Sequence, residues 1–442
     1  MSTTSQLVNS IQSCVGPQTS ITVALSGGVD SVVMLHACHL LVKQTSLPIQ
    51  LNAIHIHHGL SPNADEWLLF CQNLCEKLKV PLQYQKVKVQ AQARLSLEEI
   101  ARNARYQAID ELASAQTSAQ TSAQSSAQTI ILLGQHEDDQ AETLLLQLKR
   151  GAGPKGLSGM AERFKHKAQV EYARPWINAG IGKKEILDYA REHQLSWVED
   201  ESNQDSSFDR NFLRNEVMPA LKAKWPQINK TICRSAKLCA QQNELVEEFA
   251  LEALEKVQND NASLSIAGLS SLPKTLANEV IRLWSVQQIS FAPSAAQLDE
   301  ILKLSEAKAD QVGFVQLNDW QCRSFEQSLY WVAVADVFQT PLEQKTISLV
   351  LSGKLQTIIV SYGDLQRKVR LYANRPTKSI KTWMKESGVT PWSRLAMPIL
   401  CHNEQVIAVQ LKEQLVISDS FIDEYSINEA SHQAIQQAIR DI

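Results

Sequence analysis

The sequence lacks the features that would place it in a membrane or give it a cysteine-based metal or redox site. None of its hydrophobic runs approaches the roughly 18 residues of a membrane-spanning helix, and Met1 to Ser5 form no basic and apolar leader. Its eight cysteines include no Cys-X-X-Cys pair, which argues against a zinc knuckle or a paired redox site. Cys71 and Cys75 are interpreted as small buried hydrophobic side chains. We expect a cytoplasmic protein without a membrane partner.

The sequence also lacks an excess of positive charge. Its formal net charge is −4 at pH 7, which does not favour a nucleic-acid partner, although binding depends on local patches. One stretch, residues 367–394, is basic except for Glu386 and contains Trp383 and Trp392. Cations interleaved with aromatics suit an RNA backbone and unstacked bases; taken alone, a solvated basic face explains them equally well. The cations are Arg367, Lys368, Arg370, Arg375, Lys378, Lys381, Lys385 and Arg394.

The chain length of 442 residues predicts two or three domains. Strand and helix patterns alternate over the first half, which predicts an α/β domain with a parallel sheet and helices on both faces. Such sheets bind ligands at the carboxyl ends of their strands. Strands are expected at 21–25, 49–56, 82–89 and 130–133, and helices at 63–79, 97–112 and 139–150.

The patterns divide the chain into three expected domains. The α/β domain spans 1–218, a mainly helical domain spans 219–340 and ends in a hairpin at 312–334, and a small α+β domain spans 341–442. Residues 114–129 are four copies of Ser-Ala-Gln-Thr/Ser, with no charge and no large apolar side chain. This repeat predicts a solvated loop or a helix extension.

The turn after the first expected strand is the most informative feature. It leads directly into a helical pattern. Its glycines let the backbone approach a ligand, and the N–H groups of the helix start point at that ligand. The turn therefore predicts a phosphate or pyrophosphate site. If the Gly-Gly pair is considered by itself, an ordinary strand–helix connection is the alternative. It consists of Ser26, Gly27, Gly28, Val29, Asp30 and Ser31.

Two commoner phosphate motifs do not fit. A Walker A loop needs a glycine five residues before its Gly-Lys pair, where this sequence has Ile177 and Ser348. A Gly-X-Gly-X-X-Gly fingerprint occurs at 151–156. It follows a helical pattern rather than a strand, so we interpret it as a loop.

Two histidines lie on one face at the end of the second expected strand. As zinc ligands, His55 and His57 would need a third group, for which Asp65 is available. We prefer the interpretation that they line a polar pocket beside a nucleotide.

Charged side chains share one face of the helix expected at 97–112. Glu98, Arg102 and Arg105 are spaced at i, i+4 and i+7, which places them on one side of a helix. The pattern is as typical of a solvated, salt-bridged face as of a functional site.

An acidic cluster follows the strand expected at 130–133. Asp139 and Glu142, called the acidic pair below, are three residues apart and share a helix face. Two carboxylates can hold an ammonium group, or Mg²⁺ on phosphates. Helix N-capping explains the neighbouring Asp138 but does not require the acidic pair.

Two arginines lie four residues apart further along the chain. Arg210 and Arg214 can present guanidinium forks to phosphates. Surface salt bridges are the alternative.

Five sequence blocks occur in order: SGGVDS, HIHHGLS, LEEIARNARY, HEDDQAETLLLQLKRGAGPKGLSGM and DRNFLRN. The first resembles the PP-loop of the ATP pyrophosphatases, and together they resemble the tRNA(Ile)-lysidine synthase family. The basic stretch 367–394 resembles the last domain of that family. The resemblance covers most of the chain, and the helical middle is matched only by position and length. It implies an adenine nucleotide hydrolase-like fold for the first domain.

The resemblance implies a two-step reaction on an isoleucine tRNA with a CAU anticodon. ATP, with Mg²⁺, activates the C2 oxygen of the wobble cytidine as an adenylate and releases pyrophosphate. The amino group of free L-lysine then attacks C2, AMP leaves, and the product is lysidine. The target base must leave its stack to react.

The resemblance also implies residue roles. The backbone of the six-residue turn holds the phosphates, and Asp30 helps to position Mg²⁺. The acidic pair grips an ammonium group of lysine or accepts its proton. Arg105 balances charge at the adenylate or contacts the nucleotide, and Arg210 and Arg214 face the tRNA or the phosphates.

Other activities remain open from the sequence. A tRNA thiolase of the same superfamily needs cysteines near the PP-loop, and Cys14 and Cys38 do not supply that arrangement. An amidotransferase needs a glutaminase nucleophile, which we do not find. A non-catalytic RNA-binding protein with a relic nucleotide fold is disfavoured by the intact turn and the acidic pair. The oligomeric state, a homodimer included, and the identity of the general base are left open.

Overall fold

The computed structural model forms two compact units, Met1–Leu245 and Val246–Ile442. Each unit has its own sheets and its own hydrophobic clusters. The structure describes residues 3–16, 19–45, 49–57, 59, 61–87, 97–120, 128–166, 170–201, 205–306, 313–337, 340–351, 354–427, 432–433 and 435–437.

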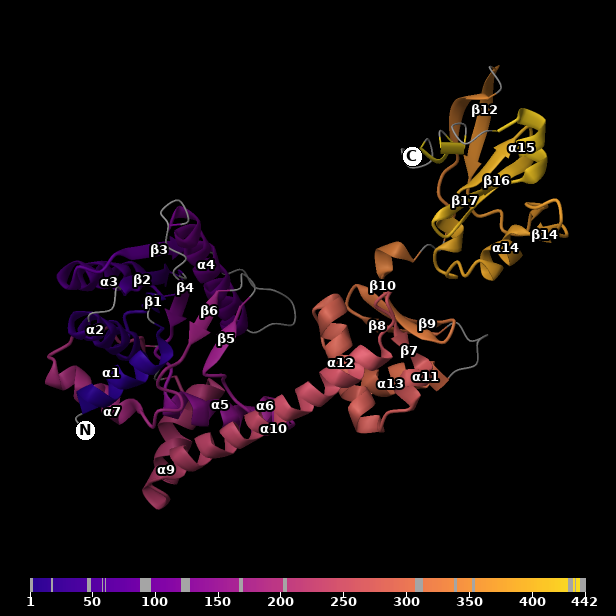
Figure 1. Ribbon diagram of the computed structural model, residues 1–442. Helices are drawn as coiled ribbons and strands as arrows, with labels where there is room; N and C mark the ends of the chain where they lie inside the picture. Colours follow the sequence, from indigo (N-terminus) through magenta and orange to yellow (C-terminus); the bar gives the residue numbers. More distant parts are fainter. Residues whose placement is uncertain are drawn as a thin grey trace. The chain divides into compact units, whose positions relative to one another are not determined.

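A six-stranded sheet in the order β3-β2-β1-β4-β6-β5 forms the centre of the first unit (Figure 1). Its neighbouring strands are parallel except for the antiparallel pair of β5 and β6. The predicted parallel sheet is confirmed, and β5 and β6 are additions to it. The strands are β1 (Thr19–Ala24), β2 (Gln50–His57), β3 (Leu82–Lys86), β4 (Gln128–Leu132), β5 (Arg163–Lys165) and β6 (Glu171–Ala173).

Helices cover both faces of this sheet, as the alternating pattern predicts. On one face, α1, α2 and α7 pack on a cluster that includes Ile21 and Val23 of β1. On the other face, α4 packs through Tyr106 and Ile109 against β2 and β4. Strands buried on both faces need nearly continuous apolar runs. The helices are α1 (Thr3–Cys14), α2 (Val29–Gln44), α3 (Ala64–Leu78), α4 (Leu97–Gln120), α5 (Glu137–Lys149), α6 (Pro154–Leu157), α7 (Lys183–Glu192), α8 (Asp209–Phe212), the π-helical η2 (Leu213–Val217), α9 (Met218–Lys224) and α10 (Ile228–Val257).

The Ser-Ala-Gln repeat begins as a helix extension. The helix expected at 97–112 continues as α4 to Gln120, because alanine and glutamine tolerate a helix well. Residues 121–127 lie outside the described residues, and the last residues of the repeat start β4.

The fingerprint-like segment 151–156 is only partly a loop. Its second half enters α6, a single helical turn that starts at Pro154. The loop interpretation is wrong there because proline suits the first position of a helix. The segment still follows a helix, α5, and not a strand.

The second unit is built on antiparallel sheets in the orders β7-β10-β9-β8 and β11-β12-β15-β16-β17, with a small β13–β14 pair. The hairpin expected at 312–334 is a three-stranded meander. The strands are β7 (Leu264–Ser265), β8 (Phe314–Leu317), β9 (Trp320–Phe325), β10 (Ser328–Ala333), β11 (Lys345–Leu351), β12 (Lys354–Ser361), β13 (Lys368–Val369), β14 (Lys378–Ser379), β15 (Ile399–His402), β16 (Gln405–Leu411) and β17 (Gln414–Ile417). The helices are α11 (Ile266–Ser270), α12 (Lys274–Ile289), α13 (Ala295–Glu306), the 3-10 turns η3 (Val334–Asp336) and η4 (Arg394–Ala396), α14 (Ile380–Glu386) and α15 (Asp419–Tyr425).

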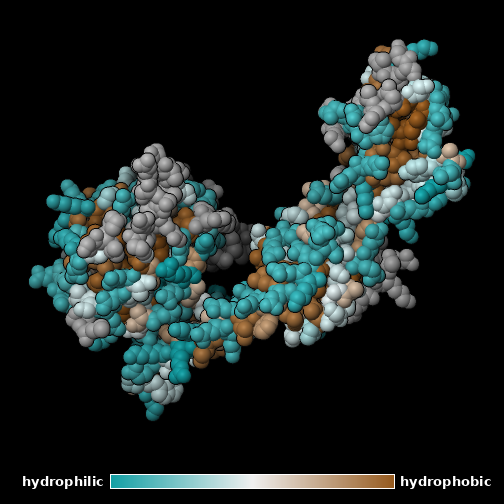
Figure 2. All heavy atoms as spheres, in the orientation of Figure 1, coloured by the Kyte–Doolittle hydropathy of each residue, from teal (hydrophilic) through white to brown (hydrophobic). Residues whose placement is uncertain are grey.

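Helix α10 contributes residues to both units and carries exposed apolar side chains. Leu238, Leu245 and Phe249 are each more than half exposed, and apolar spheres recur along this helix in Figure 2. Within the described ranges, the length and hydropathy that a membrane crossing requires are found in none of the helices.

The two tryptophans of the basic stretch are core residues. Trp383 is 1% exposed, and its Nε1 donates a hydrogen bond to Val369 O at 3.0 Å. Trp392 is 9% exposed, and its ring centre lies 5.9 Å from that of Phe325. The prediction that these side chains stack on RNA bases is therefore wrong, because Trp383 completes the core around α14 and Trp392 packs against rings of β9 and β10.

Candidate functional site

The turn after β1 has a backbone that requires glycine at Gly27. Its φ of +91° lies in the left-handed region, and a Cβ atom there would lie 2.8 Å from Val198 Cγ2. Ser31 Oγ accepts a hydrogen bond from Ser26 N at 3.1 Å and donates one to Gly28 O at 2.9 Å. These bonds fix the turn at the start of α2. The first N–H groups of a helix have no partner within the helix, so the turn suits an anion.

The loop after β4 packs directly on this turn. A Cβ atom at Gly134 would lie 2.9 Å from the backbone of Asp30, so the close approach requires glycine. β1 and β4 are neighbours in the sheet, and the strands that follow them as parallel neighbours, β2 and β6, lie in opposite directions along the strand order. The crevice at the carboxyl ends of two such strands is where parallel sheets bind ligands.

A buried histidine that sequence reasoning missed lies among three carboxylates. His136 is 2% exposed, and its ring nitrogens lie 3.5 Å from Asp138 Oδ2, 3.5 Å from Asp139 Oδ2 and 3.6 Å from Asp30 Oδ1. Burial favours the neutral imidazole, but the three carboxylates outweigh burial and raise the pKa of His136. A histidine directly before an acidic run is the sequence signal that marks it.

Arg210 and Arg214 bind the acidic pair. Arg214 donates to Glu142 Oε1 at 2.7 Å and to Oε2 at 2.8 Å, and Arg210 donates to Oε2 at 2.9 Å. Both also reach Asp139 Oδ1, at 3.2 Å from Arg210 and 3.0 Å from Arg214. The second oxygen of Asp139 accepts the backbone N–H of His136 at 3.1 Å. We call the two arginines on the acidic pair the guanidinium clasp.

The guanidinium clasp is a buried ion-pair network rather than a surface salt bridge. Glu142 is 1% exposed. Burial opposes ionisation of Asp139, but His136 and the two guanidiniums outweigh it and hold the pKa of Asp139 below its usual range. The hydrogen bonds and charge of Glu142 likewise outweigh burial and raise the pKa of Arg214. Asp139 is therefore charged at neutral pH, and both carboxylates already bind guanidinium groups.

Asp138 has a structural role. Its Oδ2 accepts the backbone N–H of Lys183 at 2.8 Å, and its Oδ1 accepts Asn229 Nδ2 at 2.9 Å and the ammonium of Lys222. Burial raises the pKa of this carboxyl group, but these donors and His136 outweigh it and lower the pKa. Asp138 thus joins α5 to α7, α9 and α10.

Asp30, in the glycine turn, is paired with Lys183 at the start of α7. Lys183 Nζ lies 2.8 Å from Asp30 Oδ1 and 3.0 Å from Oδ2. Both side chains are partly exposed, so an incoming phosphate can compete for the lysine. Sequence reasoning missed Lys183. Its position at the N-terminus of the helix after β6 is the signal that could have identified it.

The arginines of α4 are at the surface. Arg102 and Arg105 are exposed, and the guanidinium of Arg102 lies 5.7 Å from the ring centre of Tyr106. Burial lowers the pKa of His55, and the charge of Arg105 adds to this effect, which places Arg105 near the end of β2. The side chain of Glu98 lies outside the described residues.

His57 and Asp65 are brought together, but with a lysine. His57 Nε2 lies 3.2 Å from Asp65 Oδ1, which also accepts Lys86 Nζ at 2.6 Å. In the described part of the chain, no group of three His, Cys, Asp or Glu side chains is placed to hold a metal ion. The zinc alternative therefore gains no support.

Arg174 is a second buried cation that sequence reasoning missed, and no motif marks it. It is 4% exposed at the end of β6 and donates to Gln135 Oε1, to Ala161 O at 2.6 Å and to Tyr106 Oη at 3.4 Å. Its guanidinium lies 4.2 Å from the ring centre of Phe164. Among the described residues it has no carboxylate partner within 4.0 Å. Arg174 ties α4 to the loop that carries the acidic cluster.

The cysteines nearest the turn in sequence are not activated thiols. Cys14 is 3% exposed and Cys38 is fully buried, and burial raises the pKa of both. A nucleophilic cysteine needs a lowered pKa and access. Cys71 and Cys75 are also buried, as expected for small hydrophobic side chains.

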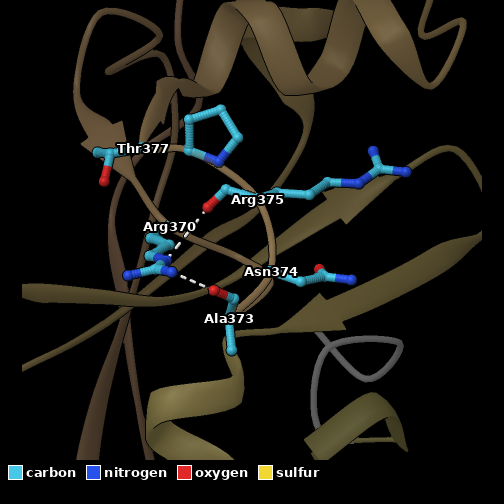
Figure 3. A pocket seen from close by; sticks show the side chains of 6 residues that line it. Arg370, Ala373, Asn374, Arg375 and Thr377 are labelled. Atoms are coloured by element: carbon cyan, nitrogen blue, oxygen red, sulfur yellow. Dashed lines mark hydrogen bonds between the residues drawn. The ribbon is translucent and has the colours of Figure 1, made fainter.

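The basic stretch of the second unit divides into structural and exposed cations. A surface pocket of about 590 Å³ is lined by residues 373–377 and Arg370, which are drawn in Figure 3. Arg370 folds back onto the loop, donating to Arg375 O at 3.1 Å and to Ala373 O, and buried Arg394 donates to Val389 O at 3.0 Å. The exposed cations are Lys368, Arg370, Arg375, Lys381 and Lys385.

The sheet, the glycine turn at the start of α2 and the charged loop of the neighbouring strand define a PP-loop protein. Residues 2–221 match the family model of the PP-loop domain, 264–330 the TilS substrate binding domain and 358–419 the TilS substrate C-terminal domain. The tRNA(Ile)-lysidine synthase of Proteus mirabilis strain HI4320 is 33% identical, over 91% of this chain and 93% of that protein. That of Vibrio vulnificus strain YJ016 is 36% identical, over 88% and 91%. The chain belongs to the tRNA(Ile)-lysidine synthase family.

A solved structure of the U34-tRNA thiolase NcsA from Methanococcus maripaludis covers 54% of this chain and 78% of its own, at 17% identity and a TM-score of 0.43. A likeness at this level carries no argument. The family assignment favours the lysidine synthase interpretation over the thiolase and relic alternatives.

Proposed function

We propose that this enzyme joins free L-lysine to C2 of the wobble cytidine in an isoleucine tRNA with a CAU anticodon. As a member of its family it is an ATP-using, tRNA-modifying ligase that acts on tRNA(Ile). The C2 oxygen attacks the α-phosphorus of ATP and pyrophosphate leaves. The amino group of lysine, having lost a proton, then attacks C2, and AMP leaves with the C–O bond electrons. The family match over most of the chain carries this proposal.

The turn after β1 is proposed to hold the phosphates of ATP. Its backbone from Ser26 to Ser31 surrounds the start of α2, and Lys183 lies beside Asp30. Asp30 also fits Mg²⁺, which proteins bind through one or two carboxylates together with substrate phosphates. Mg²⁺ bound there would neutralise phosphate charge during adenylation.

The acidic pair is proposed to bind an ammonium group of lysine and to accept its proton. The pair is buried, and it already binds two cations of the chain itself. Every oxygen of Asp139 and Glu142 accepts a hydrogen bond in the closed clasp. Lysine can bind only after Arg210 and Arg214 release some of these oxygens.

Phosphates are proposed to open the guanidinium clasp. Guanidinium forks bind phosphates as well as carboxylates, and Arg214 is 38% exposed on its side chain. Arginines that move toward the adenylate would neutralise the phosphate of the AMP that leaves, and they would free the acidic pair. Arg105, exposed on α4, is proposed to balance charge on the nucleotide. The guanidinium clasp thus delays lysine binding until the nucleotide is bound.

The domain division is likewise a proposal. We assign residues 1–218 to catalysis and 219–340 and 341–442 to tRNA contacts, with a cytoplasmic location as its tRNA substrate suggests. The exposed cations of the basic stretch suit phosphate contacts without base recognition. A homodimer remains an option for the assembly.

Incorporation of radiolabelled lysine into an unmodified isoleucine tRNA transcript with a CAU anticodon tests the proposal. ATP-dependent labelling of that transcript, and not of a methionine tRNA transcript, is the expected result. Consumption of ATP to AMP without labelling would contradict lysine as the substrate, and sulfur transfer would be tested next.

A further inference from the structure

We propose that Phe208 and Phe212 form a stacking surface for unpaired bases beside the target cytidine in the anticodon loop. The inference deepens the proposed function and rests on it. Both phenyl rings are exposed, Phe208 by 54% and Phe212 by 43%.

The ring of Phe212 lies on the side of α8 opposite the catalytic charges. At about 100° per residue, Phe212 is about 160° from Arg210 around the helix, and Arg210 points to Glu142 and Asp139. Phe208 is the extended N-cap of this helix, and its backbone O accepts a hydrogen bond from Phe212 N at 2.9 Å. The ring of Phe212 therefore points away from the acidic pair, so it contacts a neighbour of the reacting base and not the reacting base itself.

The distance across the helix matches a few nucleotides. An α-helix with its side chains is about 10–12 Å wide, and stacked bases are about 3.4 Å apart along a strand. A base one to three positions from the target cytidine thus reaches the phenyl rings while the cytidine lies at the acidic pair. A flipped base leaves its neighbours without a stacking partner, which an aromatic side chain can replace.

Cations next to the rings suit the phosphates of the same loop. Lys149 and Arg150 are exposed where α5 ends, and Lys149 Nζ lies 2.6 Å from Asp209 Oδ1. This ion pair joins the end of α5 to Asp209, which directly follows Phe208 in the sequence. Leu148, which precedes Lys149 in α5, is an exposed apolar side chain (56%). Apolar rings beside basic residues match a single-stranded nucleic acid better than a second protein surface.

The test replaces the rings without removing their apolar volume. A transcript with 2-aminopurine at the adenosine of the CAU anticodon reports stacking through fluorescence quenching. Wild-type protein is expected to quench the probe beyond free tRNA, and the double variant Phe208→Leu/Phe212→Leu to lose that quenching. The KM for tRNA is expected to rise about tenfold, with the KM for ATP unchanged. Phe314→Leu, at a 49% exposed phenyl group in the second unit, is the matched control.

The outcomes separate this inference from the proposed function. Unchanged quenching and an unchanged KM for tRNA in the double variant would overturn the stacking surface. A double variant that instead abolishes self-association of the free protein, with tRNA binding intact, would also overturn it. Wild-type protein that quenches the probe but makes no lysidine would overturn the proposed function and leave the stacking surface supported. Thermal melting of both variants should match wild type, because exposed rings contribute little to folding.

Discussion

The ligand edge of the first unit and the basic stretch of the second unit are both rich in charge, but they use it differently. At the ligand edge, buried carboxylates bind partly exposed cations, with Glu142 only 1% exposed and its bonds to the clasp at 2.7–2.9 Å. In the basic stretch most cations are exposed, and the buried Arg394 and the looped-back Arg370 bind backbone carbonyls.

The difference follows from the elements that carry the charges. Two adjacent parallel strands end beside each other, and the helices that follow them hold side chains in fixed positions. Short strands and turns around α14 instead display cations over a small core centred on Trp383. The first arrangement discriminates between ligands by geometry, and the second attracts a polyanion by charge.

Glu142→Gln tests the ligand edge with the largest expected effect. The rate of lysine transfer should fall about 10³-fold, because a neutral amide neither holds an ammonium group strongly nor accepts its proton. Release of pyrophosphate in the presence of tRNA should persist, since adenylation does not need the amine. The matched control is Glu137→Gln, in the first turn of the same helix and outside the clasp. Full lysine transfer in Glu142→Gln would contradict the account.

Trp383→Ala tests the core of the basic stretch. Loss of this buried side chain should reduce the free energy of unfolding by about 3–5 kcal/mol, measured by chemical denaturation. Lys381→Ala, two residues earlier on the same helix, should change it by less than about 0.5 kcal/mol. A Trp383 variant that binds tRNA weakly but keeps its stability would restore the rejected stacking role.

Replacing the exposed Lys368, Lys381 and Lys385 together by glutamine tests the surface of the basic stretch. Affinity for tRNA should fall about tenfold at low salt, and the slope of log affinity against log salt should drop by about 2. Thermal stability should not change. A variant with the wild-type salt slope would show that these lysines do not contact phosphates.

A fall in pH should reduce the free energy of unfolding of the first unit through His36, a residue of α2 outside the candidate site. Burial lowers the pKa of His36 to about 4, with His193 and His39 adding to the effect. The folded state therefore holds the neutral ring, and stability is lost as the pH falls from about 6.5 toward 4, by about 1–3 kcal/mol. His36→Gln should remove that loss in denaturation curves at pH 7 and pH 5. An unchanged pH dependence would contradict this assignment.

The sequence predicted those parts that local chemistry determines. The apolar run at 21–25 and the glycine turn after it specify a strand, a turn and a helix, and all three are observed. Anion binding by this turn stays a prediction. The acidic pair was found because its spacing places both carboxylates on one helix face. The prediction of a single hairpin at 312–334 was wrong because the turns of the meander contain few glycines. Residues such as Asn318 and Gln327 adopt the positive φ of these turns instead.

Tertiary contacts explain what the sequence did not predict. The pairing of Arg210 with Glu142 joins residues 68 positions apart, and no local pattern distinguishes it from a contact with phosphate. Arg174 became visible only through its buried hydrogen bonds. Trp383 was read as exposed because aromatic residues between lysines are equally compatible with a core helix and with an RNA surface.

Binding of radiolabelled lysine to the free enzyme tests the central claim, that the guanidinium clasp competes with lysine for the acidic pair. Equilibrium dialysis would compare wild type and Arg214→Gln, each with and without a non-hydrolysable ATP analogue and Mg²⁺. Wild type alone is expected to bind lysine weakly, and about tenfold more tightly with the analogue. Arg214→Gln should bind lysine tightly without it. Equal lysine affinity of both proteins under both conditions would contradict the clasp.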